Sequence, residues 1–193
     1  MKARAANFTV LDFESTGAVR GHPEEPWQVG MVEVRHGRLT GRHFEQYLRI
    51  ASTRPFNPYA PGRHAELRHV LAQAPSCGEA WPAWKPWVEN HLLAAHNAGT
   101  ERKFLQQAAP LHRFGPWVDT LKLSRRFLPE AGEYGLEAVC RSLGLMTRLE
   151  TLCPGRSWHD ALFDAYAAAL VLEVVLTVEG WAEISVEDLC AIR

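Results

Sequence analysis

The pattern of apolar and polar positions in the first fifty residues of the chain predicts β-strands. Segment 8–13 is a short run with Val10 and Leu11, segment 27–35 alternates apolar and polar residues, and segment 40–50 follows as a third strand. HGRL at 36–39 supplies a glycine turn between the last two. Consecutive strands joined by short turns pair antiparallel, so these segments predict an antiparallel meander. Segment 54–62 holds three prolines and predicts a loop.

The rest of the chain alternates helical patterns with one short apolar run. Segment 91–96 (HLLAAH) predicts a buried strand. A long helix is expected at 158–178, and its alanine, leucine and valine content predicts packing on several sides. Shorter helices are expected at 65–73, 79–90, 100–108, 120–127 and 135–143, the second of them interrupted by Pro82 and Pro86. Strands followed by helices alternating with strands predict an α/β fold with a mixed sheet.

Composition and charge narrow the class of protein. The 193 residues suit one domain, and the formal net charge of −1 means that attraction to phosphate must come from a local patch or a bound metal. No apolar run reaches the roughly 18 residues of a membrane span, and the N-terminal segment lacks a signal-peptide pattern. The four cysteines form no CxxC pair, so neither a zinc site nor a disulfide framework is indicated. A reduced, cytoplasmic compartment is therefore expected.

Two carboxylates stand at the end of the first predicted strand. Asp12 and Glu14 are two residues apart, so in a strand both side chains point to one face. Oxygen ligands at that spacing suit Mg²⁺ or Mn²⁺. Taken alone, the pair also fits an acidic turn at a strand end.

The start of the long helix carries a second group. His159 and Asp164 are five residues apart, so both lie near one end of that helix. Asp164 precedes an apolar stretch, where a carboxylate is costly unless it is paired or binds metal. The alternative is a helix-capping acid, a role that Asp160 fits better than Asp164 does.

The buried strand 91–96 runs into a third polar segment. His96 and Asn97 lie at its end, where sites of α/β folds gather, and Glu101 can reach the same sheet edge. The alternative is that Thr100 caps the following helix and that Glu101 is only favoured there by the helix dipole.

These three segments, in this order, resemble the DEDDh (DnaQ-like) 3′–5′ exonucleases of the ribonuclease H-like superfamily. The matching pieces are DFESTG at 12–17, HNAGTERKFL at 96–105 and HDALFDA at 159–165, within a similarity that covers roughly residues 7–178. The resemblance implies a ribonuclease H-like mixed sheet flanked by helices, with residues 1–180 as the exonuclease domain. Residues 181–193 are expected to be a C-terminal extension that packs on the same domain as a short helix, because 185–188 has the pattern of a helix start.

The resemblance also implies roles for individual residues. Two ions, Mg²⁺ or Mn²⁺, would be held by Asp12, Glu14, Glu101 and Asp164, with His159 as general base. Substrate contacts are implied for Ser15, Thr16, Gly17, His96 and Asn97. The family normally has Asp where this chain has Glu101, which extends the carboxylate by roughly 1.5 Å. A displacement of about 1 Å can cost on the order of a hundredfold in rate, so this departure bears on activity.

The implied function is two-metal hydrolysis of phosphodiester bonds at the 3′ end of DNA or RNA, with release of nucleoside monophosphates. The bound end is expected to be single-stranded and no membrane is involved, while a homodimer or a polymerase partner stays open. One alternative, motivated by Glu101, is a catalytically weakened nucleic-acid-binding or scaffold protein of the same fold. Another is an unrelated α/β binding domain, which requires the motif order to be accidental.

Two further groups of side chains have two interpretations each. Three neighbouring tryptophans could stack on bases, although core packing is their more common role. They are Trp81, Trp84 and Trp87. Five basic residues could line a phosphate path or form a solvated helix face. They are Arg102, Lys103, Lys122, Arg125 and Arg126.

Overall fold

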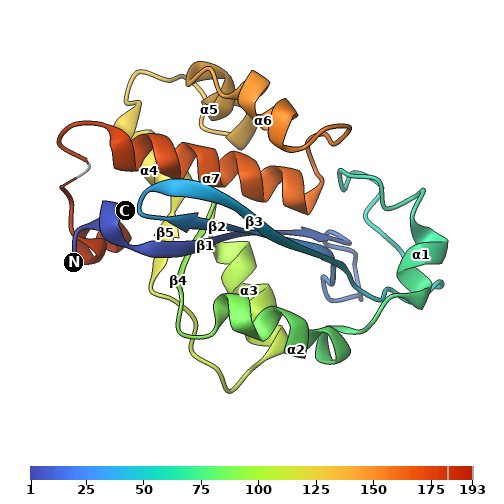
Figure 1. Cartoon of the computed structure of the whole chain (residues 1–193). Helices are drawn as coiled ribbons and strands as arrows, with labels where there is room; N and C mark the ends of the chain where they lie inside the picture. Colours follow the sequence, from blue (N-terminus) through green and yellow to red (C-terminus); the bar gives the residue numbers. More distant parts are fainter. Residues whose placement is uncertain (182, 193) are drawn as a thin grey trace.

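A five-stranded mixed sheet forms the centre of the computed structural model, which describes residues 1–181 and 183–192 (Figure 1). Its strands are β1 (Asn7–Ser15), β2 (Pro26–Arg35), β3 (Arg38–Tyr47), β4 (Leu92–Ala95) and β5 (Trp117–Asp119). In the order β3-β2-β1-β4-β5, the first three strands are antiparallel, and β4 and β5 run parallel to β1. The mixed sheet and the antiparallel meander are therefore confirmed.

Helices cover both faces of the sheet (Figure 1). On one face α7 (Ala161–Thr177) packs against β1 and β2, and α4, α5 and α6 pack against α7. These three helices span Thr120–Phe127, Leu136–Ser142 and Met146–Leu152. The opposite face is covered by α2 (Cys77–Val88) and α3 (Gly99–Ala108). Figure 1 shows α1 (Arg68–Gln73) at one end of the sheet, where it packs on a small separate cluster around Trp27.

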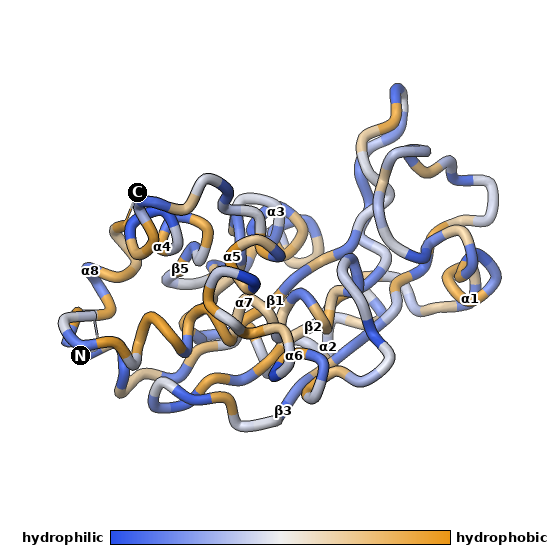
Figure 2. The backbone as a smooth tube through the Cα atoms, turned by 90° about the horizontal axis from the view of Figure 1, so that it is seen from above, coloured by the Kyte–Doolittle hydropathy of each residue, from blue (hydrophilic) through white to orange (hydrophobic). Residues whose placement is uncertain are grey.

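The composition of α7 explains its place in the fold. The residues of α7 are apolar on all sides of the helix. This fits its surroundings, since the sheet covers one side and three helices cover the others. Figure 2 shows this concentration of hydrophobic residues along α7, with hydrophilic residues in the peripheral loops. The packing on several sides that the sequence predicts is confirmed. One buried acid within the helix, Glu173, pairs with Arg148 at 2.7 Å.

The predicted interruption of the second helix is wrong. α2 runs through Pro82 and Pro86 without a break and begins with a capping box formed by Ser76. Each proline removes one backbone hydrogen bond, but Trp84 and Trp87 are buried between α2 and the sheet, and this burial offsets the loss. Core packing is also the role of these tryptophans, with Trp81 packed against the same cluster.

One local alternative is wrong, and two short elements are not predicted. Thr100 does not cap α3, because the helix already begins at Gly99 and its N-cap residue, Ala98, has no side-chain hydrogen bond. β5 and α6 are too short for the hydrophobic periodicity of the sequence to reveal them. β5 has three residues, too few to show an alternation, and α6 has seven, fewer than two full turns.

The ends of the chain lie together. α8 (Val186–Ala191) begins after Ser185, whose hydroxyl accepts a hydrogen bond from the Asp188 amide, and the Val186 amide donates to the Met1 carbonyl at 3.0 Å. The helix start at 185–188 is thus observed, whereas the division of the chain at residue 180 stays a prediction. No helix within 1–181 or 183–192 is long and apolar enough to cross a membrane.

Candidate metal and catalytic site

Polar side chains gather where β1 and its parallel neighbours β4 and β5 end. Asp12 and Glu14 lie on β1 and flank Phe13, which points to the opposite face and packs against Trp84 and Phe104. The two acids therefore share the face that α7 covers, as the strand alternation predicts. Ligand sites in α/β folds form at this edge of a sheet because the strands end there together.

A glycine brings the start of α7 close to this edge. Gly30 on β2 pairs with Asp12, and a Cβ atom placed on Gly30 would lie 2.3 Å from the carbonyl oxygen of Ala161. Only a residue without a side chain permits this approach of β2 to the first turn of α7. As a result Asp164, in that first turn, lies over the acidic end of β1.

The tightest group of possible metal ligands combines one residue of β1 with two residues around the start of α7. One ligand atom from each of Glu14, His159 and Asp164 lies within 4.8 Å of the others, and no second group of this kind occurs in the part of the chain that the structure describes. Asp12 and Glu101 are outside this tightest group. His159 has an exposed side chain and a positive φ of 66°, and its backbone N–H donates to Asp164 Oδ2 at 3.2 Å.

Burial and repulsion from nearby acids raise the pKa values of these four carboxyl groups. Burial is the largest cause in every case, and it raises the pKa of Asp12 well above its ordinary value, with further contributions from Asp164 and Glu101. The pKa of Glu14 rises to about 8 and that of Asp164 to about 7. Burial also raises the pKa of Glu101 to about 8, an effect that hydrogen bonds from the backbone of Glu101 itself and of Phe13 partly counter. None of these four acids forms an ion pair with a lysine or arginine among the residues described.

The donor set fits a divalent cation. Glu101 Oε2 and Asp164 Oδ1 are buried and have no hydrogen-bond partner within the described residues. Buried carboxylate oxygens without partners are costly, and oxygen ligands of this kind are those that Mg²⁺ and Mn²⁺ prefer. Glu101, only 3% exposed, reaches this region from the first turn of α3 despite its extra methylene group.

The turn after β1 is held by its own side chains. Ser15 Oγ donates to Glu24 Oε1 at 2.7 Å and accepts from the Gly17 amide at 3.2 Å. Thr16 is fully buried, and its hydroxyl oxygen accepts from Arg54 Nη2 at 3.2 Å. The Thr16 side chain therefore faces the protein. Its backbone N–H donates to the Glu25 carbonyl at 2.9 Å and its carbonyl accepts from the Asn57 amide at 2.8 Å, so Thr16 holds the shape of the turn.

The side chain of His96 faces the protein, whereas that of Asn97 is exposed. His96 Nε2 lies 2.9 Å from the carbonyl oxygen of Tyr134, to which it must donate, and Nδ1 lies 3.0 Å from Thr120 Oγ1. Burial lowers the pKa of His96, which favours the neutral form of its ring. Asn97 has an exposed side chain, and its backbone N–H donates to Asp119 Oδ1 at 3.0 Å.

Three residues near the site are not identified by the sequence reasoning. Asp119 caps α4 and raises the pKa of Glu101, and its position before a helical pattern was the available signal. Gly62 lies in the proline-rich loop, where an added Cβ would be 3.0 Å from the carbonyl oxygen of His159. Arg156 contacts Asp160, whose expected capping role the structure confirms. No local pattern marks Gly62 or Arg156.

Known proteins share both the sequence pattern and the architecture. The model of the RNase_T exonuclease family matches residues 9–172. The DNA polymerase III epsilon subunit of Rickettsia prowazekii is 28% identical over 179 residues, which covers 89% of this chain and 73% of that protein. The PolC-type DNA polymerase III of Thermotoga petrophila is 29% identical over 170 residues, or 86% of this chain, which spans only 12% of that longer protein.

Solved structures of exonucleases have a similar fold. The structure of exonuclease X in complex with 5′-overhanging duplex DNA matches with a TM-score of 0.72 and 25% sequence identity, and covers 96% of this chain and 98% of that one. A structure of exonuclease I matches with a TM-score of 0.68 at 14% identity, over 90% of this chain and 41% of the other. The second likeness is one of fold.

Proposed function

Because the chain belongs to the RNase_T exonuclease family, we propose that it is a metal-dependent 3′–5′ exonuclease that releases nucleoside monophosphates from a nucleic-acid end. The observation that carries this proposal is the meeting of Glu14, His159 and Asp164 at the edge of the sheet. DNA is the favoured substrate, because exonuclease X was solved with duplex DNA and the sequence relatives are named as DNA polymerases or their subunits. Those names also support a polymerase partner.

Four carboxylates would hold the metal, as Mg²⁺ or Mn²⁺ in a two-ion site: Asp12, Glu14, Glu101 and Asp164. Divalent ions in such a site stabilise charge on the attacking and leaving oxygens during displacement at phosphorus. The raised pKa values of these acids mean that a cation must displace protons to bind, so binding strengthens as pH rises. The orphaned oxygens of Glu101 and Asp164 supply acceptors for it.

The remaining chemistry belongs to side chains at the rim. His159 is exposed beside Glu14 and Asp164, where its imidazole can accept the proton of the attacking water as a general base. The turn at Ser15, Thr16 and Gly17 would lie along the terminal nucleotide, with Thr16 holding the turn in shape through its contacts with Glu25 and Asn57. Asn97 would contact the substrate directly, whereas His96 would hold the segment that presents it.

A labelled oligonucleotide tests the proposal. A 5′-labelled single strand of DNA, incubated with Mg²⁺ or Mn²⁺, should give a ladder of descending length, and excess chelator should abolish it. Undiminished cleavage in chelator would refute the metal requirement, and efficient cutting of a closed circular single strand would show an endonuclease. An RNA strand of the same sequence, run in parallel, decides the substrate.

The same assay distinguishes an active exonuclease from the alternative, a catalytically weakened scaffold protein. Such a protein would bind the strand in a filter or anisotropy measurement without shortening it, with either metal. The four free cysteines support a reduced compartment, and we propose the cytoplasm as the place of action.

A further inference from the structure

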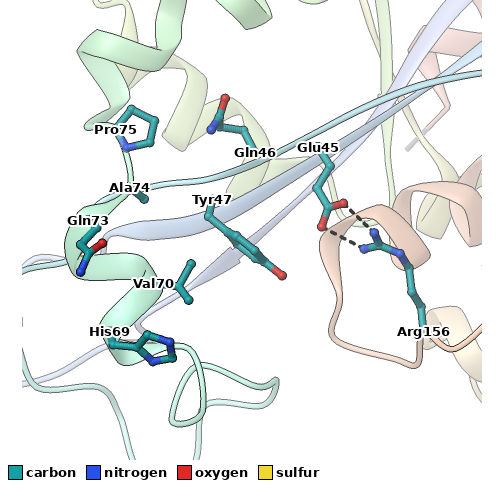
Figure 3. A pocket seen from close by; sticks show the side chains of 9 residues that line it. All are labelled: Glu45, Gln46, Tyr47, His69, Val70, Gln73, Ala74, Pro75 and Arg156. Atoms are coloured by element: carbon teal, nitrogen blue, oxygen red, sulfur yellow. Dashed lines mark hydrogen bonds and ion pairs between the residues drawn. The ribbon is translucent and has the colours of Figure 1, made fainter.

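One arginine ties the start of α7 to the edge of the sheet. Arg156 lies in the segment between α6 and α7, and its Nη1 and Nη2 atoms are 2.9 and 2.6 Å from the two carboxylate oxygens of Glu45 on β3 (Figure 3). Nη1 also lies 2.8 and 2.9 Å from the two oxygens of Asp160, the N-cap residue of α7. A single guanidinium thus joins the carboxylate of Asp160 to that of Glu45, which lies 111 residues before Arg156 in the chain.

The network continues into the backbone of α7. Asp160 Oδ1 accepts hydrogen bonds from the amides of Leu162 and Phe163 at 3.1 and 3.2 Å. Gln28 on β2 donates to Glu45 Oε1 at 2.8 Å and accepts from the Ala161 amide at 3.3 Å. β2, β3 and the first turn of α7 are therefore held by one set of polar contacts.

These contacts affect the site because His159 belongs to the segment that they hold. His159 stands between Arg156 and Asp160 in the chain, in a left-handed conformation that non-glycine residues seldom adopt without support from their surroundings. Its side chain is exposed, so packing does not hold it. Asp12 and Glu14 are fixed on β1, and the distance of His159 and Asp164 from them depends on what ties α7 to the sheet.

On the outer side of Arg156, no packed side chains among the residues described could replace its ion pairs in holding α7 to the sheet. There the residue borders an open cavity of about 560 Å³, whose other lining residues include Tyr47 and His69 (Figure 3). The side chains of Arg156, Glu45 and Asp160 are 31%, 23% and 22% exposed, so the ion pairs are only partly screened by water.

We propose that Arg156 is a positioning residue for the exonuclease reaction, an inference that rests on the function proposed above. By clamping Asp160 to Glu45, Arg156 fixes His159 and Asp164 relative to the acids of β1. Arg156 acts through these contacts and touches no reacting group itself.

The chain contains a matched control for this clamp. Arg148 on α6 pairs with Glu173 on α7 at 2.7 Å, and Glu173 Oε2 also accepts from the Leu39 amide of β3 at 2.7 Å. The ion pair joins α6 to α7, and the Leu39 contact joins α7 to the same strand. Glu173 lies about 13 Å further along the helix than Asp164, at about 1.5 Å per residue. Loss of Arg148 should therefore affect stability without moving the site.

The test compares Arg156→Gln, Arg156→Lys and Arg148→Gln with the wild type in steady-state turnover of a 5′-labelled single strand with Mg²⁺. Arg156→Gln should lower kcat by about tenfold to a hundredfold, the range expected for a displacement approaching 1 Å, while KM stays within about twofold. Arg156→Lys should recover part of the loss, since it keeps the charge but not the fork that bridges two carboxylates. Arg148→Gln should keep the wild-type kcat despite a lower Tm.

Amide hydrogen exchange supplies a readout that needs no activity. In Arg156→Gln, exchange should accelerate over residues 157–163, and in Arg148→Gln it should not. Equal kcat in the wild type and Arg156→Gln, or an equal loss of kcat in both glutamine variants, would overturn the inference. If Arg156→Gln fails to fold, Glu45→Gln removes the sheet side of the clamp and takes its place. A wild type inactive on every strand refutes the proposed function instead, and the exchange pattern alone then decides whether the clamp exists.

Discussion

Replacing Asp164 by Asn should stabilise the metal-free protein at alkaline pH. Burial, together with the neighbouring acids Asp160 and Glu137, raises the pKa of the Asp164 carboxyl in the folded protein from 3.8 to about 7. The folded state therefore keeps a proton that the unfolded chain releases, so this residue lowers the free energy of unfolding progressively between about pH 4 and pH 7. The cost is fully present above pH 7 and absent below pH 4.

The size of the effect follows from that pKa. A rise from 3.8 to about 7 corresponds to about 4 kcal/mol of destabilisation at pH 8. Asparagine removes the charge and keeps an oxygen that can accept the His159 amide, as Asp164 Oδ2 now does at 3.2 Å. For a chain of this length, relief of about 4 kcal/mol raises Tm by roughly 10 °C.

Thermal melting in excess chelator at pH 5 and pH 8 measures this difference. Asp164→Asn should melt well above the wild type at pH 8, and the gap should shrink at pH 5. The control is Glu150→Gln, an exposed acid on α6, which should follow the wild type at both values. Added Mn²⁺ should raise the Tm of the wild type more than that of Asp164→Asn. Coincident melting curves for the wild type and Asp164→Asn at pH 8 would refute the idea that this carboxylate is buried without compensation.

Three further changes test the site and its support. Asp12→Ala should reduce cleavage of a 5′-labelled strand to background while circular dichroism shows an intact fold; a rate near that of the wild type would remove Asp12 from the site. Glu101→Asp should lower single-turnover rates and Glu101→Ala should lower them further, because α3 already places the longer side chain at the site; three equal rates would exclude this carboxylate from metal binding. Gly30→Ala, whose Cβ would lie 2.3 Å from the Ala161 carbonyl oxygen, should cost about 1–3 kcal/mol in urea unfolding and reduce activity, and unchanged values for both would contradict the close approach of α7 to β2.

Local patterns in the sequence determine several features of this protein by themselves. The two-residue spacing of Asp12 and Glu14 places both acids on one face of β1, because a strand repeats every two residues. The apolar composition of segment 161–177 determines that α7 is enclosed, and Asp160 and Ser185 mark helix starts through short-range hydrogen bonds. In each case the residues that interact are close together in the chain.

Only the tertiary structure decides which distant groups meet. The approach of Glu14 to His159 and Asp164 depends on the register of β1 with β2 and on the missing side chain of Gly30. The inward direction of the Thr16 hydroxyl depends on Arg54, which reaches it from a loop 38 residues away. The pairing of Arg156 with Glu45 likewise spans 111 residues. Periodicity describes which face of an element is apolar, whereas these contacts depend on how the elements are arranged in space, which a local pattern does not encode.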